Sequence, residues 1–115
     1  MDEKLELIQR QVCAKYDVPF FACNLDLKVG ISPDVRDGIR PIYGVRVEPI
    51  EGSSGWLFWA GEGPPSEDPD FYMPLHGIHL SEWAPLVLPY LGLSPGWYFC
   101  ITEQYEDVWY GGVGE

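Results

Sequence analysis

Apolar positions near the N-terminus recur with the period of a helix, at Leu5, Ile8, Val12 and Tyr16. Acidic residues gather at the start of this stretch, where the positive end of the helix dipole stabilises negative charge. Pro19 disfavours helical backbone at the preceding residue. The pattern therefore predicts a helix over residues 3–16.

The next stretch changes to a period of two, which is typical of strands. Residues 20–31 predict a strand with the partial alternation Leu25, Leu27, Val29 and Ile31. Residues 40–49 predict a second strand, whose apolar face carries Tyr43, Val45 and Val47 and whose other face carries Ile42, Gly44, Arg46 and Glu48. Between the two strands, Ser32 as N-cap and Pro33 at the first helical position predict one short turn of helix that Gly38 ends.

The sequence "WLFWA" of residues 56–60 is short, aromatic and bounded by glycines, so it predicts a central strand that is apolar on both faces. Residues 61–70 follow as an exposed loop, because their prolines cannot donate to a strand ladder. Residues 71–80 fit helix and strand equally well. Residues 80–93 predict a short, broken helix with Ser81 as its N-cap, and residues 97–102 predict a strand. Residues 105–112 are a last strand or a tail.

These elements predict an α+β fold: a mainly antiparallel sheet, an N-terminal helix and a short helix in the C-terminal half. The chain has 115 residues, which suits one domain over residues 1–115. We find no internal repeat and no linker long enough to divide it.

The composition and the first residues indicate in which cellular compartment the protein is expected. Hydrophobic residues make up 46% of the chain, yet no apolar run approaches the ~18 residues that a membrane span needs. The first residues lack the basic and apolar regions of a secretory signal, so we expect a cytoplasmic protein. Cys13, Cys23 and Cys100 are widely spaced, which favours free thiols in a reducing compartment over disulfides or a zinc knuckle.

Charge is distributed unevenly along the chain. All seven basic residues lie within the first 46 positions, where seven acids balance them. Residues 47–115 carry eleven carboxylates and no Lys or Arg. Such a surface repels nucleic acid and anionic lipid, so we expect neither as a partner. It suits a basic protein partner, although an acidic surface also simply keeps a protein in solution.

No pattern of catalytic residues stands out. His76, His79 and Glu82 could hold zinc, but Pro74 and Gly77 interrupt the helix that a zinc-protease motif needs, so we expect no metal and no cofactor. The loop sequence "SEDPD" lacks the ligand spacing of a calcium-binding EF-hand. Glu103, Glu106 and Asp107 could form an acid/base pair as in glycosidases, but paired acids are common in any acidic protein.

Several short motifs follow one another in the order seen in a known family. They are "RPI" at residues 40–42, "VRVEP" at 45–49, "SGWLFWAGE" at 54–62, then "DPDFY", "LPYL" and "SPGWYF". Over Ile31 to Phe99 the chain resembles the small bacterial immunity proteins of polymorphic toxin loci known as immunity family thirty-three. The most distinctive block is "SGW.F..GE" followed by an acidic segment that contains prolines.

The resemblance implies a non-catalytic cytosolic antidote that binds and blocks a cognate toxin domain, one with a basic surface. The candidate partner-binding residues are the exposed acids Glu62, Glu67, Asp68, Asp70, Glu103, Glu106 and Asp107. The expected structural core contains Trp56, Phe58, Trp59 and Trp97, while Trp83, Trp97 and Trp109 are also candidates for an interface anchor. The alternatives are an acidic interaction or regulatory module with a non-toxin partner and, more distantly, a small acidic hydrolase.

Overall fold

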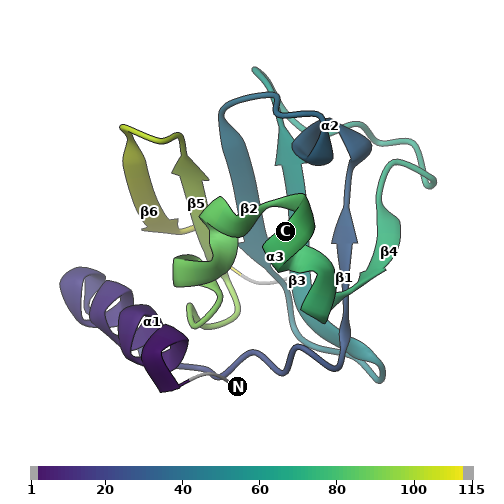
Figure 1. The fold of residues 1–115 in the computed structure, drawn as a ribbon. Coiled ribbons are helices and arrows are strands. Elements are labelled where there is room, and N and C mark those ends of the chain that lie inside the picture. The colour runs from purple at the N-terminus through teal and green to yellow at the C-terminus, as the bar shows by residue number, and fades with distance from the viewer. Residues whose placement is uncertain (1–2, 113–115) are drawn as a thin grey trace.

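The computed structural model describes residues 3–112 and is built around a six-stranded sheet (Figure 1). The strand order is β4-β1-β3-β2-β5-β6. Strands β1 and β3 pair in parallel, and the other four pairings are antiparallel. The mainly antiparallel α+β fold expected from the sequence is confirmed.

The elements follow the predicted order closely. Helix α1 covers Glu3–Tyr16, as the hydrophobic spacing predicts, and α2 covers Pro33–Arg36. The strands are β1 (Lys28–Ile31), β2 (Ile42–Arg46), β3 (Ser53–Ala60), β4 (Met73–His76), β5 (Trp97–Ile101) and β6 (Glu106–Tyr110). The remaining helices are the 3-10 helix η1 (Gly77–His79), α3 (Leu80–Trp83) and the 3-10 helix η2 (Pro85–Tyr90).

The strand predicted over residues 20–31 is wrong for most of its length, because only Lys28–Ile31 joins the sheet. The backbone of the preceding residues is bonded elsewhere. Phe21 N–H donates to the carbonyl of Gly92, and Leu27 N–H donates to the carbonyl of Asn24 in a turn. A second bond in that turn runs from Asp26 N–H to Asn24 Oδ1. Alternating side chains therefore do not produce a ladder here.

The broken helix predicted over residues 80–93 is present, but Ser81 lies inside it and is not its N-cap. Leu80 opens α3, and the Ser81 hydroxyl donates to the carbonyl of Ile78 at 3.4 Å. The break falls at Ala84, whose φ of −158° is extended, and Pro85 then starts η2, where a missing N–H is tolerated.

The helices α1, α2, α3 and η2 all pack on one side of the sheet, which we call the helix face (Figure 1). Between them and the sheet lies an aromatic core in which Trp56 stacks on Phe58 at 5.5 Å and both contact Phe99. All three side chains are completely buried. We call the opposite side of the sheet the open face.

Strand β2 presents to the core the face that the sequence pattern treats as polar. Ile42, Gly44 and Arg46 point to the helix face, and all three are buried. Gly44 is required there, because a Cβ at this position would lie 2.4 Å from the Phe99 ring. The apolar residues Tyr43 and Val45 consequently lie on the open face.

Arg46 is 1% exposed and has no carboxylate partner among residues 3–112. Its guanidinium instead donates to five backbone carbonyls, those of Ser54, Phe21, Leu91, Leu93 and Ala22, at 2.6–3.1 Å. Burial lowers the pKa of Arg46 from its ordinary value. The side chain thus joins the loop before β1 and the loop before β5 to the centre of the sheet.

Within residues 3–112, no helix reaches the length and apolarity that crossing a membrane requires.

Candidate functional site

The acidic loop, residues 61–72, leaves the end of β3 and carries four exposed carboxylates: Glu62, Glu67, Asp68 and Asp70. Two local hydrogen bonds from backbone N–H groups to side chains hold its tip. They run from Asp68 N–H to Ser66 Oγ at 3.1 Å and from Asp70 N–H to Asp68 Oδ1 at 2.9 Å. None of the four carboxylates makes an ion pair with a basic residue of the described chain. They are available to a partner.

The three acids of the C-terminal hairpin, Glu103, Glu106 and Asp107, do not form one cluster, because neighbouring residues of β6 point to opposite faces of the sheet. Glu103, in the turn before β6, pairs with Arg40, with 2.9 Å between Arg40 Nη2 and Glu103 Oε2. Glu106 lies on the helix face, and Asp107 lies exposed on the open face.

Glu106 has internal partners on three sides. Its carboxylate accepts from Lys15 Nζ at 2.8 Å, from Tyr90 Oη at 2.5 Å and from the hydroxyl of Tyr16. Burial raises the pKa of Glu106, but these hydrogen bonds and the charge of Lys15 outweigh it and hold the pKa at about 2. The carboxylate therefore fastens α1 and η2 to β6, and its role in partner binding stays a prediction.

The open face is an aromatic surface formed by two rows of side chains that cross the sheet. One row runs Leu57–Val45–Tyr98–Trp109, and the next runs Trp59–Tyr43–Cys100–Asp107. Within these rows Tyr43 stacks on Trp59 with ring centroids 5.3 Å apart, and Tyr98 stacks on Trp109 at 5.5 Å. Neither row contains a Lys or Arg.

A groove of about 290 Å³ lies on this surface, where the acidic loop folds back over the sheet. Two loop residues, Pro65 and Tyr72, form part of its wall, and burial raises the pKa of the Tyr72 hydroxyl to about 12. This groove, which we call the open-face groove, is lined by Val45, Val47, Leu57, Trp59, Pro65, Tyr72, Tyr98 and Gly112. The acidic loop thus borders an apolar groove.

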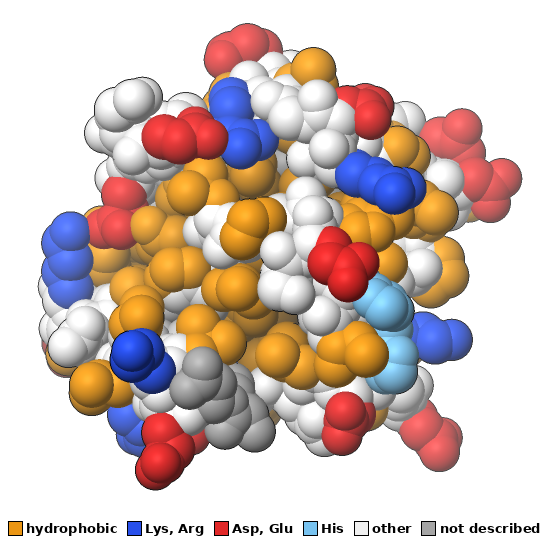
Figure 2. All heavy atoms as spheres, viewed as in Figure 1, with side chains coloured by type: hydrophobic (Ala, Val, Ile, Leu, Met, Phe, Trp, Pro, Cys, Tyr) orange, Lys and Arg blue, Asp and Glu red, His pale blue; other side chains and the backbone are white. Residues whose placement is uncertain are grey.

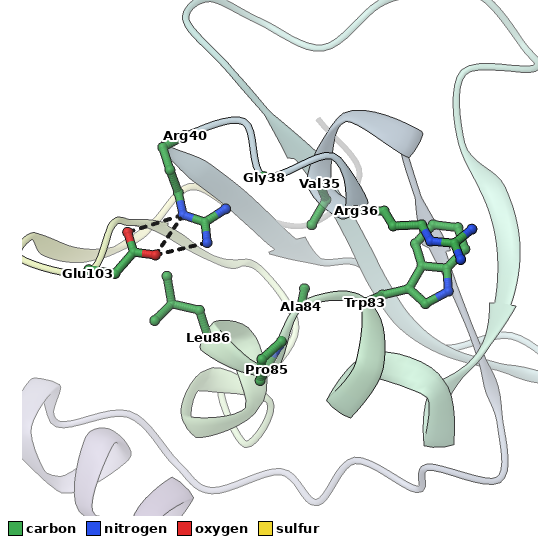
Figure 3. A pocket seen from close by; sticks show the side chains of 9 residues that line it. All are labelled: Val35, Arg36, Gly38, Arg40, Trp83, Ala84, Pro85, Leu86 and Glu103. Atoms are coloured by element: carbon green, nitrogen blue, oxygen red, sulfur yellow. Dashed lines mark hydrogen bonds and ion pairs between the residues drawn. The ribbon is translucent and has the colours of Figure 1, made fainter.

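A second groove, of about 370 Å³, lies between α2 and the α3–η2 segment on the helix side (Figure 3). Val35 lines it on the α2 side, and Ala84, Pro85 and Leu86 line it on the other side. Arginines stand at its two ends: Arg36 lies over the Trp83 ring at 4.8 Å, and Arg40 is bonded to Glu103. We call it the arginine groove.

The helix side as a whole mixes both signs of charge. Lys and Arg side chains alternate with Asp and Glu around a broad apolar centre (Figure 2). This side is therefore not a continuous acidic patch. The two rows of the open face combine aromatic rings with a carboxylate, and the exposed Lys28 of β1 lies on the same face beyond Leu57.

The histidines are held by contacts of their own. His76 Nε2 lies 2.9 Å from the carbonyl of Asp26, and His79 Nδ1 lies 4.0 Å from Glu82. Among residues 3–112 no three His, Cys, Asp or Glu side chains are grouped so as to hold a metal ion. Cys13 and Cys23 are buried free thiols, and Cys100 is a half-buried one.

The five tryptophans differ in their environments. Trp56 is completely buried, and its indole N–H donates to the carbonyl of Leu91. Trp59 is 7% exposed under the open face, and within the described part of the chain its indole N–H has no acceptor. Trp97 and Trp83 are half-buried on the helix side, and Trp109 is 36% exposed on the open face.

Sequence reasoning did not identify the open-face groove, although two signals of it were present. The apolar set Tyr43, Val45 and Val47 belongs to the open face, and Trp109 was among the candidate anchors. The groove depends on the return of the acidic loop across β1 and β3, where Tyr72 lies against Gly30 and Leu57. No local pattern encodes that return.

Comparison with known proteins gives one match. Residues 8–111 match the family model of the Imm33-like domain. No curated protein and no solved structure matches the chain.

Proposed function

Because the chain belongs to the Imm33-like family, an immunity protein family of polymorphic toxin systems, we propose that it binds a cognate toxin domain and neutralises it without catalysis. The family match over residues 8–111 is the observation that carries this proposal, since it spans nearly the whole described chain. We place the protein in the cytoplasm of the cell that makes the toxin, where such an antidote is needed.

We further propose that binding uses the acidic surface, with the toxin domain presenting basic residues. The support is the set of exposed carboxylates on residues 47–115, a part of the chain that has no Lys or Arg. Opposite charges steer two proteins together and raise the association rate, most strongly at low salt. Toxins that act on nucleic acid carry the cationic surfaces that such an antidote complements.

The candidate residues are not equivalent. Glu62, Glu67, Asp68 and Asp70 are exposed and have no basic partner among the described residues, so they can meet a partner without losing an internal bond. Asp107 is similarly exposed. Glu103 and Glu106 already pair with Arg40 and Lys15, so their contribution to the partner is expected to be smaller.

Capture of the toxin tests the function. The purified protein should retain, from a cell lysate that contains it, the C-terminal domain of the toxin encoded in the neighbouring reading frame, in a stoichiometric complex. Retention of a different cellular protein, with no binding to that domain, would favour the alternative of an acidic regulatory module with a non-toxin partner.

Association kinetics test the acidic surface separately. Replacing Glu62, Glu67, Asp68 and Asp70 by their amides should leave the fold intact, because exposed charges contribute little to stability. It should slow association and weaken its dependence on salt, since steering is screened over about 8–10 Å at physiological salt. The matched control changes four exposed acids of the helix side and of α1 in the same way: Glu3, Asp34, Asp37 and Glu82. Equal association rates for the two variants would show that the loop has no special part.

A further inference from the structure

The geometry points to the open-face groove as the place where the toxin domain docks, with a basic segment whose apolar side chain enters the groove while its Lys or Arg lies on the neighbouring rings. This inference rests on the proposed function and deepens it, because it assigns the binding surface and the chemistry of the segment bound. It goes beyond the acidic loop, because it adds the apolar groove that the loop borders.

The first argument is the exposed aromatic surface beside the groove. Tyr98 lines the groove and stacks on Trp109, which is 36% exposed although it lies in a strand. Large exposed rings on a sheet are costly unless a partner covers them, and Trp and Tyr are the residues that most often anchor interfaces. Their faces also attract the cationic side chains of Lys and Arg.

The second argument is charge. Glu62 and Asp107 lie close enough to the open face to raise the pKa of the Cys100 thiol, although burial contributes more. The loop acids at residues 67–70 fall between Pro65 and Tyr72, two residues that line the groove. The lining of the groove has no Lys or Arg, and the loop that borders it carries carboxylates, so a cationic segment is favoured over an acidic or a neutral one.

The third argument is an unpartnered donor. Trp59 lines the groove and is only 7% exposed, yet its indole N–H has no acceptor among residues 3–112. A buried N–H without a partner costs about 1–3 kcal/mol. The nitrogen itself is closed to solvent, so the Trp59 ring has to shift before a carbonyl of a bound segment can accept from it.

The arginine groove offers the contrast that makes the assignment testable. It has a similar size, but Arg36 and Arg40 stand at its ends and would repel a basic segment (Figure 3). Trp83 lies in that groove and is half-buried, so it serves as an internal reference for Trp109 on the opposite side of the sheet.

Hydroxyl-radical footprinting of the wild-type complex tests the inference without any substitution. The toxin domain of the neighbouring reading frame is added to the protein, and oxidation of each aromatic side chain is read by mass spectrometry. Oxidation of Trp109 and Tyr98 should fall several-fold on binding, while that of Trp83 should stay unchanged. Protection of Trp83 with Trp109 and Tyr98 still reactive would overturn the assignment.

Charge reversal gives a second readout. The double variant Glu62→Lys with Asp107→Lys should weaken binding of the toxin domain by about tenfold or more, because like charges at an interface disfavour association. The control Glu82→Lys, exposed on the helix side, should change the affinity by less than about twofold. Equal effects of the two variants would also overturn the inference. If the wild-type protein binds no toxin domain at all, the proposed function itself fails, and this inference fails with it.

Discussion

Arg46 offers the sharpest test of how this fold is held together, through the substitution Arg46→Met. Methionine keeps an unbranched apolar stem that ends where Nε of the arginine stands, and it removes every hydrogen bond of the guanidinium. Those bonds reach five backbone carbonyls from three separate segments of the chain. The hydrogen bonds that the substitution removes therefore end in the loop before β1, in strand β3 and in the loop before β5.

The magnitude follows from which carbonyls remain without a donor. Leu91 O keeps the indole N–H of Trp56, and the carbonyls of Phe21 and Ala22 belong to exposed residues that water can reach. The carbonyls of Ser54 and Leu93 are buried. At about 1–3 kcal/mol for each unsatisfied acceptor, the cost is roughly 2–6 kcal/mol. Removing a desolvated charge returns part of it, so the net loss is about 2–4 kcal/mol.

Urea unfolding followed by tryptophan fluorescence measures this loss directly. Arg46→Lys should also destabilise the protein, because the three donors of an ammonium cannot replace the planar guanidinium at five carbonyls. The control is Arg36→Met, whose arginine lies exposed over Trp83 and should cost no more than about 1 kcal/mol. An Arg46→Met protein as stable as the wild type would refute the reasoning.

Three further predictions concern the remaining buried groups and the histidines. Glu106→Gln should lower the free energy of unfolding at pH 7 by roughly 2–3 kcal/mol, because the folded pKa of Glu106 of about 2 lies below its unfolded value. The stability that the Glu106 carboxylate contributes is complete above the unfolded pKa and is lost as the pH falls toward 2. Urea unfolding at a series of pH values should therefore show a shallower loss of stability with acid for the variant than for the wild type. Trp56→Ala and Trp59→Ala should each destabilise by ~3–5 kcal/mol, and unchanged melting of both variants would contradict the placement of β3 at the centre of the sheet. Elemental analysis of the untagged protein should find no stoichiometric metal, and zinc that disappears when His76 and His79 are changed to Ala would show that prediction to be wrong.

Helix α1 and strand β3 could be predicted from the sequence because local pattern decides them. The apolar positions of α1 recur every three to four residues, and β3 is an aromatic run between glycines. The strand predicted from residue 20 failed because a distant carbonyl, that of Gly92, takes the N–H of Phe21. Alternation alone does not reveal where a backbone N–H finds its partner.

The same limit explains the two charged residues whose positions were not anticipated. Arg46 looks like a surface residue of an alternating strand, but its acceptors lie 8 to 47 positions away along the chain. Glu106 looks like one more acid of an acidic tail, but its partners Lys15 and Tyr16 lie 91 and 90 positions away. In both cases the burial of a charge is decided by tertiary packing.

One part of the candidate site follows from local sequence, and another part depends on tertiary packing. The exposure of the loop acids follows from their prolines and glycines, which exclude a strand ladder. The groove beside these acids does not follow from local sequence, because it forms only where Pro65 and Tyr72 of the loop come together with Leu57 and Tyr98 of the sheet. The aromatic residues that favour strand β3 and the carboxylates of the loop thereby meet at one surface.

Protection of growing cells is the measurement that tests neutralisation most directly. The C-terminal toxin domain from the neighbouring reading frame is expressed in cells with or without this protein, and survival is counted after induction. We predict that the toxin domain alone arrests growth and that co-expression restores it, with weaker protection by the Glu62→Lys, Asp107→Lys variant than by Glu82→Lys. Growth arrest that persists at full expression of the wild-type protein would contradict the account.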